Sequence, residues 1–230
     1  MVDGRQLLER MAIIPRDGIC LDGIYLRGDR SPSLLVVPTR PGSMESAIVS
    51  EAAYAAADRG FASLRFNFQG IGASEGERTD DPDEAVADLL AARNHLLLTA
   101  GGEKVAVCGI GSGAAAAWRF ACGEPGRVDR LILVGPETAD PIWEHLRQAP
   151  CRTLILYGEL DDAVDPAFLG SWQAREPKIT VIPFPETTKA MRRSLSRLGA
   201  EVGDWLDADF EGRSNEPAQG EPNTRGTDGG

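Results

Sequence analysis

The sequence predicts an α/β protein with one folded domain, in which helices cover both faces of a mostly parallel sheet. Short apolar runs, typical of buried strands, alternate with longer helical segments from residue 19 to about residue 208. The chain has 230 residues, which fits one domain followed by a tail. Its hydrophobic content of 42% is enough to fill a core.

Seven segments have the pattern of strands. The first alternates apolar and polar residues, and the third places Leu64, Phe66 and Phe68 on one face. The others are short, continuous apolar runs, as expected for strands that are buried on both faces. The predicted strands are residues 19–26, 34–37, 62–68, 105–108, 131–134, 153–157 and 179–182.

Four helices are predicted between these strands. The first is rich in alanine, and the second has acidic residues in its first turn, as the helix dipole favours. Because most strands are followed by a helix that returns the chain to the start of the next strand, neighbouring strands should be parallel. The predicted helices are residues 46–58, 83–98, 114–120 and 190–206.

The charge balance argues against nucleic-acid and membrane-surface partners. The chain has 24 Lys and Arg against 35 Asp and Glu, a net charge of −11, which repels phosphate backbones and anionic lipid. No apolar run reaches the roughly 18 residues that a membrane helix needs. Charged residues interrupt the first fifteen positions, which therefore lack a signal-peptide core. We expect a cytoplasmic protein.

The cysteines and histidines do not have the spacing of a disulfide framework or a metal site. The four cysteines are isolated from one another, and the chain has only two histidines, His95 and His145. We therefore expect no metal and no cofactor. The scarcity of histidine limits acid–base chemistry at neutral pH.

Four strings resemble the small α/β-hydrolases. GFASLRFNFQGIGASEGE (60–77) resembles a strand and loop of that family, and VAVCGIGSGAAAA (105–117) resembles its nucleophile elbow. RVDRLILVGP (127–136) and TLILYGELDDAVDP (153–166) resemble the strands that follow. The resemblance covers about residues 19–208 and implies the α/β-hydrolase fold. Only a short segment separates Pro136 from Arg152, which implies that the cap domain of many relatives is missing.

The family elbow reads G-x-S-x-G, with the nucleophile at its centre. Gly109 and Gly113 match the flanking glycines, so the nucleophile position falls on Gly111. Glycine has no side chain and cannot attack a carbonyl carbon. Ser112 is the next residue, and its hydroxyl should point elsewhere, because the elbow presents only its central residue.

The other parts of the catalytic machinery are also altered. The string VIPFPETTKA places Thr187, or its neighbour Thr188, where the family has its histidine. The acidic position is retained as Asp161 or Asp162. The oxyanion loop of the family corresponds here to PTRPGSM (38–44), with one glycine. The resemblance therefore implies a degenerate catalytic triad at Gly111, Asp161 and Thr187.

These departures favour a pseudoenzyme that acts as a binding or scaffold protein for a protein partner or a small ligand. Thr39 and Arg40 are candidates to line the former active site. The N–H groups of Ser112 and Gly113 open a helix and could bind an anion. The sequence leaves the oligomeric state open.

Two other interpretations remain. One is an esterase-like or thioesterase-like hydrolase, or another enzyme, with a non-standard site. The other is a dinucleotide-binding protein, because Gly109, Gly111 and Ala114 match G-x-G-x-x-G/A and Glu137 follows the next strand. The position of this motif in the middle of the chain disfavours the second, since the motif usually opens the first strand–helix unit.

Two sets of residues have plainer structural interpretations. The acidic run at 75–84 is typical of a solvated loop and helix start. The four tryptophans mostly fall in helical segments, where they usually anchor a core or an interface. They are Trp118, Trp143, Trp172 and Trp205.

The chain end has a different composition from the domain at residues 1–209. Residues 210–230 are rich in Gly, Pro, Asn and Glu and have almost no apolar side chains to bury, which predicts a disordered tail.

Deleting residues 211–230 should leave the melting temperature within about one degree of the full chain, because no apolar anchor is removed. Thermal unfolding followed by circular dichroism measures this. A drop of several degrees would mean that the tail packs on the domain.

Overall fold

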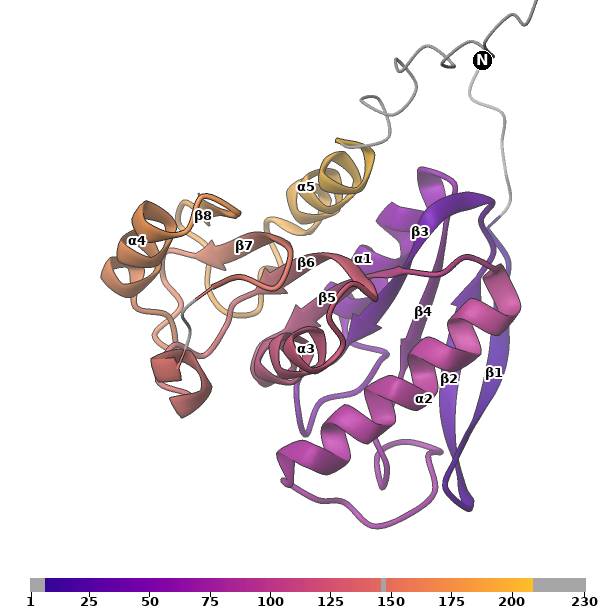
Figure 1. Cartoon of the computed structure of the whole chain (residues 1–230). Helices are drawn as coiled ribbons and strands as arrows, with labels where there is room; N and C mark the ends of the chain where they lie inside the picture. Colours follow the sequence, from indigo (N-terminus) through magenta and orange to yellow (C-terminus); the bar gives the residue numbers. More distant parts are fainter. Residues whose placement is uncertain (1–6, 146–147, 209–230) are drawn as a thin grey trace, which may run out of the picture.

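The computed structural model describes residues 7–145 and 148–208, which form a single eight-stranded sheet (Figure 1). The strand order is β1-β2-β4-β3-β5-β6-β7-β8. β2 runs antiparallel to both of its neighbours, and all pairs from β4 to β8 are parallel. The strands are β1 Glu9–Arg16, β2 Ile19–Leu26, β3 Arg30–Val37, β4 Phe61–Phe66, β5 Val105–Ile110, β6 Val128–Val134, β7 Arg152–Gly158 and β8 Ile179–Phe184.

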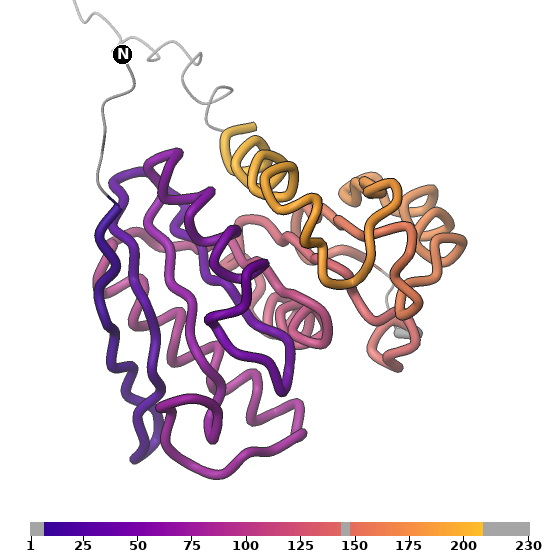
Figure 2. The backbone as a smooth tube through the Cα atoms, turned by 180° about the vertical axis from the view of Figure 1, so that it is seen from behind, coloured from indigo at the N-terminus to yellow at the C-terminus, as the bar shows by residue number. Residues whose placement is uncertain are grey.

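Helices cover both faces of the sheet, so the predicted α/β class is confirmed. α2, α3 and α4 pack on one face, while α1 and α5 pack on the other, as the view from behind shows (Figure 2). The helices are α1 Ala47–Asp58, α2 Pro82–Ala100, α3 Ser112–Gly123, α4 Pro166–Arg175 and α5 Leu195–Asp207, with a short 3-10 helix η1 at Pro141–His145. Within the described residues, no helix is long and apolar enough to cross a bilayer. The predicted tail at 210–230 lies outside these residues.

Strand β1 was missing from the sequence prediction. It is the edge strand of the sheet, and both of its faces carry apolar residues. Ala12 and Ile14 are buried, whereas Met11 and Ile13 are 74% and 71% exposed. The alternation of apolar and polar residues that marks a half-buried strand is therefore absent from its sequence.

The prediction was also wrong about two helices. Helix α4 was not predicted, because it buries only Leu169 and Trp172 and its apolar pattern is weak. Its start has a recognisable signal, since Asp165 caps it and Pro166 occupies the first turn. The closing helix begins at Leu195 rather than at residue 190, after a turn in which Met191 has a φ of 49°.

Helix α5 is tied to the sheet and to α1 by two arginines. Buried Arg130, at the start of β6, donates hydrogen bonds of 2.8 and 3.1 Å to the carbonyl oxygens of Trp205 and Leu206. A cation at the C-terminal end of a helix also complements the helix dipole. Arg59 on α1 forms ion pairs with Asp204, at 2.6 Å, and with Asp207.

Three of the tryptophans pack against one another, which confirms their predicted place in the core. The ring centroid of Trp118 lies 5.8 Å from that of Trp143 and 4.9 Å from that of Trp172. All three side chains are buried, and they join α3, η1 and α4 on one face of the sheet. Trp205 on α5 is only half-buried, with the Arg152 guanidinium 5.1 Å from its ring centroid.

The substitution Trp118→Ala should lower the free energy of unfolding by about 3–5 kcal/mol, because it opens a cavity among three packed rings. The same substitution at half-buried Trp205 serves as the control and should cost clearly less. Urea unfolding followed by far-UV circular dichroism measures both. Equal losses at the two positions would contradict a central role for the tryptophan cluster.

Candidate functional site

The turn between β5 and α3 has the geometry of a nucleophile elbow. Gly111 is the residue between the two elements, with φ 57° and ψ −125°. Its N–H donates to the carbonyl oxygen of Val134 at 2.9 Å, and its own carbonyl oxygen accepts from Ala114 N at 3.0 Å. A side chain in this left-handed region costs of order 1–3 kcal/mol, and glycine avoids that cost.

The three glycines of the turn meet different neighbours. A Cβ at Gly109 would lie 2.7 Å from the Cα of Ala114, and one at Gly113 would lie 2.3 Å from the Pro38 carbonyl oxygen. Both positions therefore exclude any larger residue. A Cβ at Gly111 would lie 2.9 Å from Thr39 Oγ1. The Thr39 side chain thus lies where the side chain of a nucleophile would begin.

The Ser112 hydroxyl is occupied by contacts with the loop after β3. Its Oγ accepts a hydrogen bond of 2.8 Å from Arg40 N and donates one of 3.1 Å to the Arg40 carbonyl oxygen. Thr39 Oγ1 lies 3.1 Å from the same Oγ. A hydroxyl has one proton and two lone pairs, so the Thr39 hydroxyl donates and the bonding capacity of Ser112 is full. These contacts hold the Ser112 hydroxyl against the loop after β3.

The same contacts use one of the N–H groups of the loop after β3. In active enzymes of this fold, the hole combines the N–H after the nucleophile with an N–H from the loop after β3. The corresponding donors here are Ser112 N and an N–H of the loop that holds Thr39 and Arg40. Since Arg40 N already donates to Ser112 Oγ, that donor is not available to a substrate oxygen.

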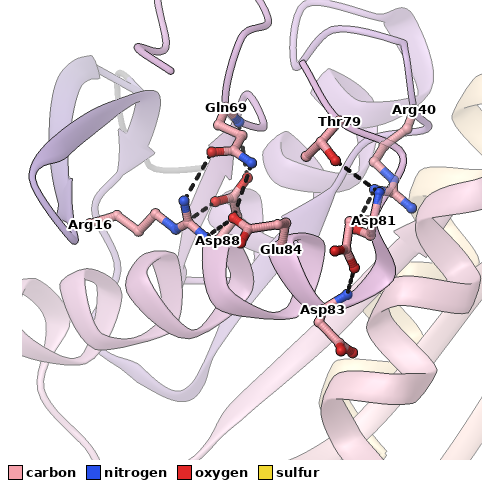
Figure 3. A network of polar contacts seen from close by, with 8 residues as sticks. All are labelled: Arg16, Arg40, Gln69, Thr79, Asp81, Asp83, Glu84 and Asp88. Carbon is pink, nitrogen blue, oxygen red and sulfur yellow. Dashed lines mark hydrogen bonds and ion pairs between the residues drawn. The ribbon is translucent and has the colours of Figure 1, made fainter. Parts of the chain in front are cut away.

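The Arg40 side chain points to the start of α2 (Figure 3). Its Nη1 donates to the Asp81 carbonyl oxygen at 3.2 Å, and its guanidinium lies 5.6 Å from the ring centroid of Phe68. These contacts hold the guanidinium against the loop between β4 and α2. Arg40 was considered as a residue that could line the site, but its charged group is used elsewhere.

A second polar network fixes the loop between β4 and α2 (Figure 3). Buried Asp88 on α2 accepts from Gln69 N at 2.9 Å, and its other oxygen lies 3.0 Å from Arg16 Nε on β1. Arg16 also pairs with Glu84 and donates to Gln69 Oε1 at 2.9 Å. The loop is therefore held from both the edge strand and the helix.

The acidic position is a buried carboxyl group at the end of β7. Asp161 is 5% exposed, and its Oδ1 accepts from Ala163 N at 3.1 Å. Its Oδ2 has no hydrogen-bond partner among the described residues, and it lies 3.1 Å from where a Cβ of Gly135 would be. Burial raises the pKa of the Asp161 carboxyl. Its neighbour Asp162 is exposed.

The base position has a structural role. Thr187 is 3% exposed, and its Oγ1 donates to the Pro185 carbonyl oxygen at 2.9 Å and lies 2.7 Å from Ser194 Oγ. Within the described part of the chain, no hydrogen bond joins Thr187 to Asp161. A threonine hydroxyl cannot accept a proton at neutral pH, as an imidazole does. Thr188 is exposed.

No other ionisable side chain described at this edge replaces the missing groups. His95 lies on α2, where burial lowers the pKa of its imidazole, and the His145 side chain is outside the described part. Cys108, three residues before Gly111, is fully buried, which raises its thiol pKa to about 12. Among the described residues, no three His, Cys, Asp or Glu side chains are grouped to hold a metal ion.

A pocket of about 400 Å³ lies beside the base position, between the loops that follow β7 and β8. This pocket was not predicted from the sequence. A sequence feature that could have indicated the pocket is the pair of adjacent arginines, Arg192 and Arg193, in an acidic chain. The lining residues are Leu160, Glu186, Thr187, Thr188, Arg192 and Arg193.

Glu137, the acidic residue of the dinucleotide interpretation, accepts from Lys189 Nζ at 3.1 Å. Its carboxylate therefore neutralises a neighbouring lysine. The fold gives that interpretation no support.

Comparisons with known proteins agree with this strand order. Residues 41–141 match the family model described as serine aminopeptidase, S33. A search of curated protein sequences gives no significant match. Several solved structures of α/β hydrolases superpose on nearly the whole chain.

One is a protein of unknown function from Agrobacterium tumefaciens, described as a putative α/β hydrolase, with 23% identity and a TM-score of 0.77 over 91% of this chain and 100% of that one. Another is an α/β serine hydrolase homologue from Coxiella burnetii, with 22% identity and a TM-score of 0.77 over 86% and 97%. A third is a Xanthomonas campestris α/β serine hydrolase without a lid, with 22% identity and a TM-score of 0.74 over 88% and 94%.

The segment between β6 and β7 shows whether the fold carries an inserted cap domain. Residues 135–151 contain η1, and their described part holds no inserted cap domain. With its strand order, its elbow after β5 and these structural relatives, the protein is an α/β-hydrolase-fold protein without a cap domain.

Proposed function

We propose that the protein does not hydrolyse esters and acts by binding a ligand at the carboxyl edge of its sheet. The observation that carries this proposal is the position of Thr39 over Gly111. A nucleophile at residue 111 would need the space that the Thr39 hydroxyl occupies, 2.9 Å from the Cβ position. Residue 111 therefore offers no nucleophilic side chain, and a serine there would require the Thr39 hydroxyl to move.

The chemistry of ester cleavage supports the same conclusion. A serine nucleophile needs an adjacent base to accept its proton, and the tetrahedral intermediate needs at least two aligned donors. Here the base position is Thr187, whose hydroxyl is already paired within its own loop. One N–H of the loop that would supply an oxyanion donor, Arg40 N, is bound by Ser112. No complete catalytic unit remains among these residues.

A hydrolase that uses Ser112 is the alternative. It would require the Ser112 hydroxyl to leave its three contacts with Thr39 and Arg40 and to find a base. The described residues offer no histidine side chain at this edge. Binding is therefore the better-supported function, and the ligand is a small molecule or a partner protein.

Purified protein should hydrolyse p-nitrophenyl acetate no faster than its Ser112→Ala variant, because neither form has an activated nucleophile. Absorbance of the released nitrophenolate measures the rate, and a fluorophosphonate probe should label neither form. Turnover or labelling that disappears in Ser112→Ala would overturn the proposal.

The substitution Gly111→Ser should lower the free energy of unfolding by about 1–3 kcal/mol, through its positive φ and its contact with Thr39. Gly126→Ser is the matched control: Gly126 has a φ of 78° and nothing within 4 Å of its Cβ position, so it carries the backbone cost alone. Adding Thr39→Ala to Gly111→Ser should recover only the part of the lost unfolding free energy that comes from the contact with Thr39.

Four variants are compared by urea unfolding: Gly111→Ser, Gly126→Ser, Thr39→Ala and Gly111→Ser/Thr39→Ala. The parent, the two single variants at 39 and 111 and the double variant give the coupling free energy between these residues. Independent, additive effects of the two substitutions would show that the Thr39 side chain does not block the nucleophile position. A Gly111→Ser variant as stable as the parent would show that residue 111 is not at a strained elbow.

A further inference from the structure

The pocket between the loops after β7 and β8 has fixed walls. Leu160 N, in the first loop, donates to the Thr187 carbonyl oxygen in the second loop at 2.9 Å. The approach is so close that a Cβ at Gly158 would lie 2.2 Å from that carbonyl oxygen. The Thr187–Ser194 contact of 2.7 Å then joins the second loop to the start of α5. The backbone around the pocket of about 400 Å³ is therefore held in place, while most of the side chains that line it are exposed.

Two arginines bring unneutralised positive charge to this pocket. Arg192 and Arg193 are exposed and line it, and within the described part of the chain neither has a hydrogen-bond or ion-pair partner. The next cations along the chain are paired: Lys189 with Glu137 at 3.1 Å, and Arg197 with Glu201 at 3.7 Å. In a chain of net charge −11, two adjacent free guanidinium groups at a cavity need a physical reason.

The remaining lining groups define the shape and polarity of a ligand. Leu160 is 61% exposed, so an apolar surface borders the charged groups. Thr188 is exposed at the same pocket and has a hydroxyl that can donate or accept. Among the described lining residues, Glu186 is the carboxylate, and it opposes an anion. The described part of the lining thus carries two cations and one anion.

We infer that this pocket binds a small organic anion, with a phosphate or carboxylate group held by Arg192 and Arg193 and a short apolar group against Leu160. Guanidinium groups form paired, charge-assisted hydrogen bonds with both kinds of anion. The inference deepens the proposed binding function by naming a site and a ligand class, and it rests on that function only for its biological meaning. Ligand binding here needs no residue of the former triad except the wall formed by Thr187.

Isothermal titration calorimetry of the full chain tests the ligand class. Phenyl phosphate and benzoate are the anionic probes, and benzyl alcohol is the neutral probe of similar size. We expect at least one anion to bind with a dissociation constant of about 1 mM or lower, and benzyl alcohol to bind at least about tenfold more weakly. Comparing the two anions decides between phosphate and carboxylate.

Variants test the location. Arg192→Gln/Arg193→Gln should weaken anion binding at least about tenfold, whereas Arg127→Gln, which removes a charge from an exposed turn outside the pocket lining, should leave it unchanged. Glu186→Gln should tighten binding, because it removes the opposing charge. Leu160→Ala should weaken binding of phenyl phosphate but not of inorganic phosphate. Circular dichroism checks that each variant is folded.

Two outcomes would overturn the inference: no saturable binding of either anion up to about 10 mM, or anion binding that is unchanged in the arginine double variant. Neither outcome bears on hydrolysis, which is measured separately with Ser112→Ala. Ester turnover that depends on Ser112 would instead refute the proposed function and leave the anion site intact. The two failures are therefore distinguishable.

Discussion

The turn at residues 109–113 passes so close to the end of β3 that a Cβ at Gly113 would overlap the Pro38 carbonyl oxygen, at 2.3 Å. This approach follows from the register, which sets Val37 beside Gly109 and aligns the carboxyl ends of β3 and β5. The sheet can place α3 on its face only if the turn is made of small residues. Gly109 and Gly113 are therefore required by packing, whatever the protein does. A G-x-G-x-G string of this kind records the geometry of the fold and says nothing by itself about catalysis.

Only the central glycine bears on activity, and its effect depends on the loop after β3. The close approach puts Thr39 within reach of both Gly111 and Ser112, and it gives the Ser112 hydroxyl two backbone partners on Arg40. Gly111, the hydrogen-bonded N–H of Arg40 and the contacts of Ser112 therefore belong to one arrangement of groups. A serine at residue 111 would disturb the contacts that stabilise the turn, since it would add both backbone strain and steric overlap. Stability and catalytic competence are opposed at this elbow.

Much of the fold could be predicted from the sequence, because buried parallel strands appear as apolar runs whatever their neighbours are. The predictions failed where burial was incomplete. The edge strand β1 exposes Met11 and Ile13, and α4 buries only two side chains. At the site, the sequence located the elbow turn, because the turn depends on local backbone geometry. It could not show that Thr39 fills the nucleophile position or that Arg40 turns toward Asp81, since those contacts join residues about 40 to 70 positions apart.

The pocket beside Thr187 shows that the sequence also does not reveal which charged side chains are neutralised by a neighbour. Lys189, Arg192, Arg193 and Arg197 form one basic stretch in the sequence, and nothing in their order says which of them are neutralised. The fold decides this, because β6 ends next to Lys189 and supplies Glu137, while α5 supplies Glu201 one turn after Arg197. Arg192 and Arg193 have no such neighbour within the described part of the chain, and they are the two that line a cavity. At the carboxyl edge of the sheet, an N–H of the loop after β3 is thus engaged by Ser112, while the loop after β8 carries exposed positive charge. On the proposed function, the electrostatic attraction for an anion at this edge is strongest at the pocket.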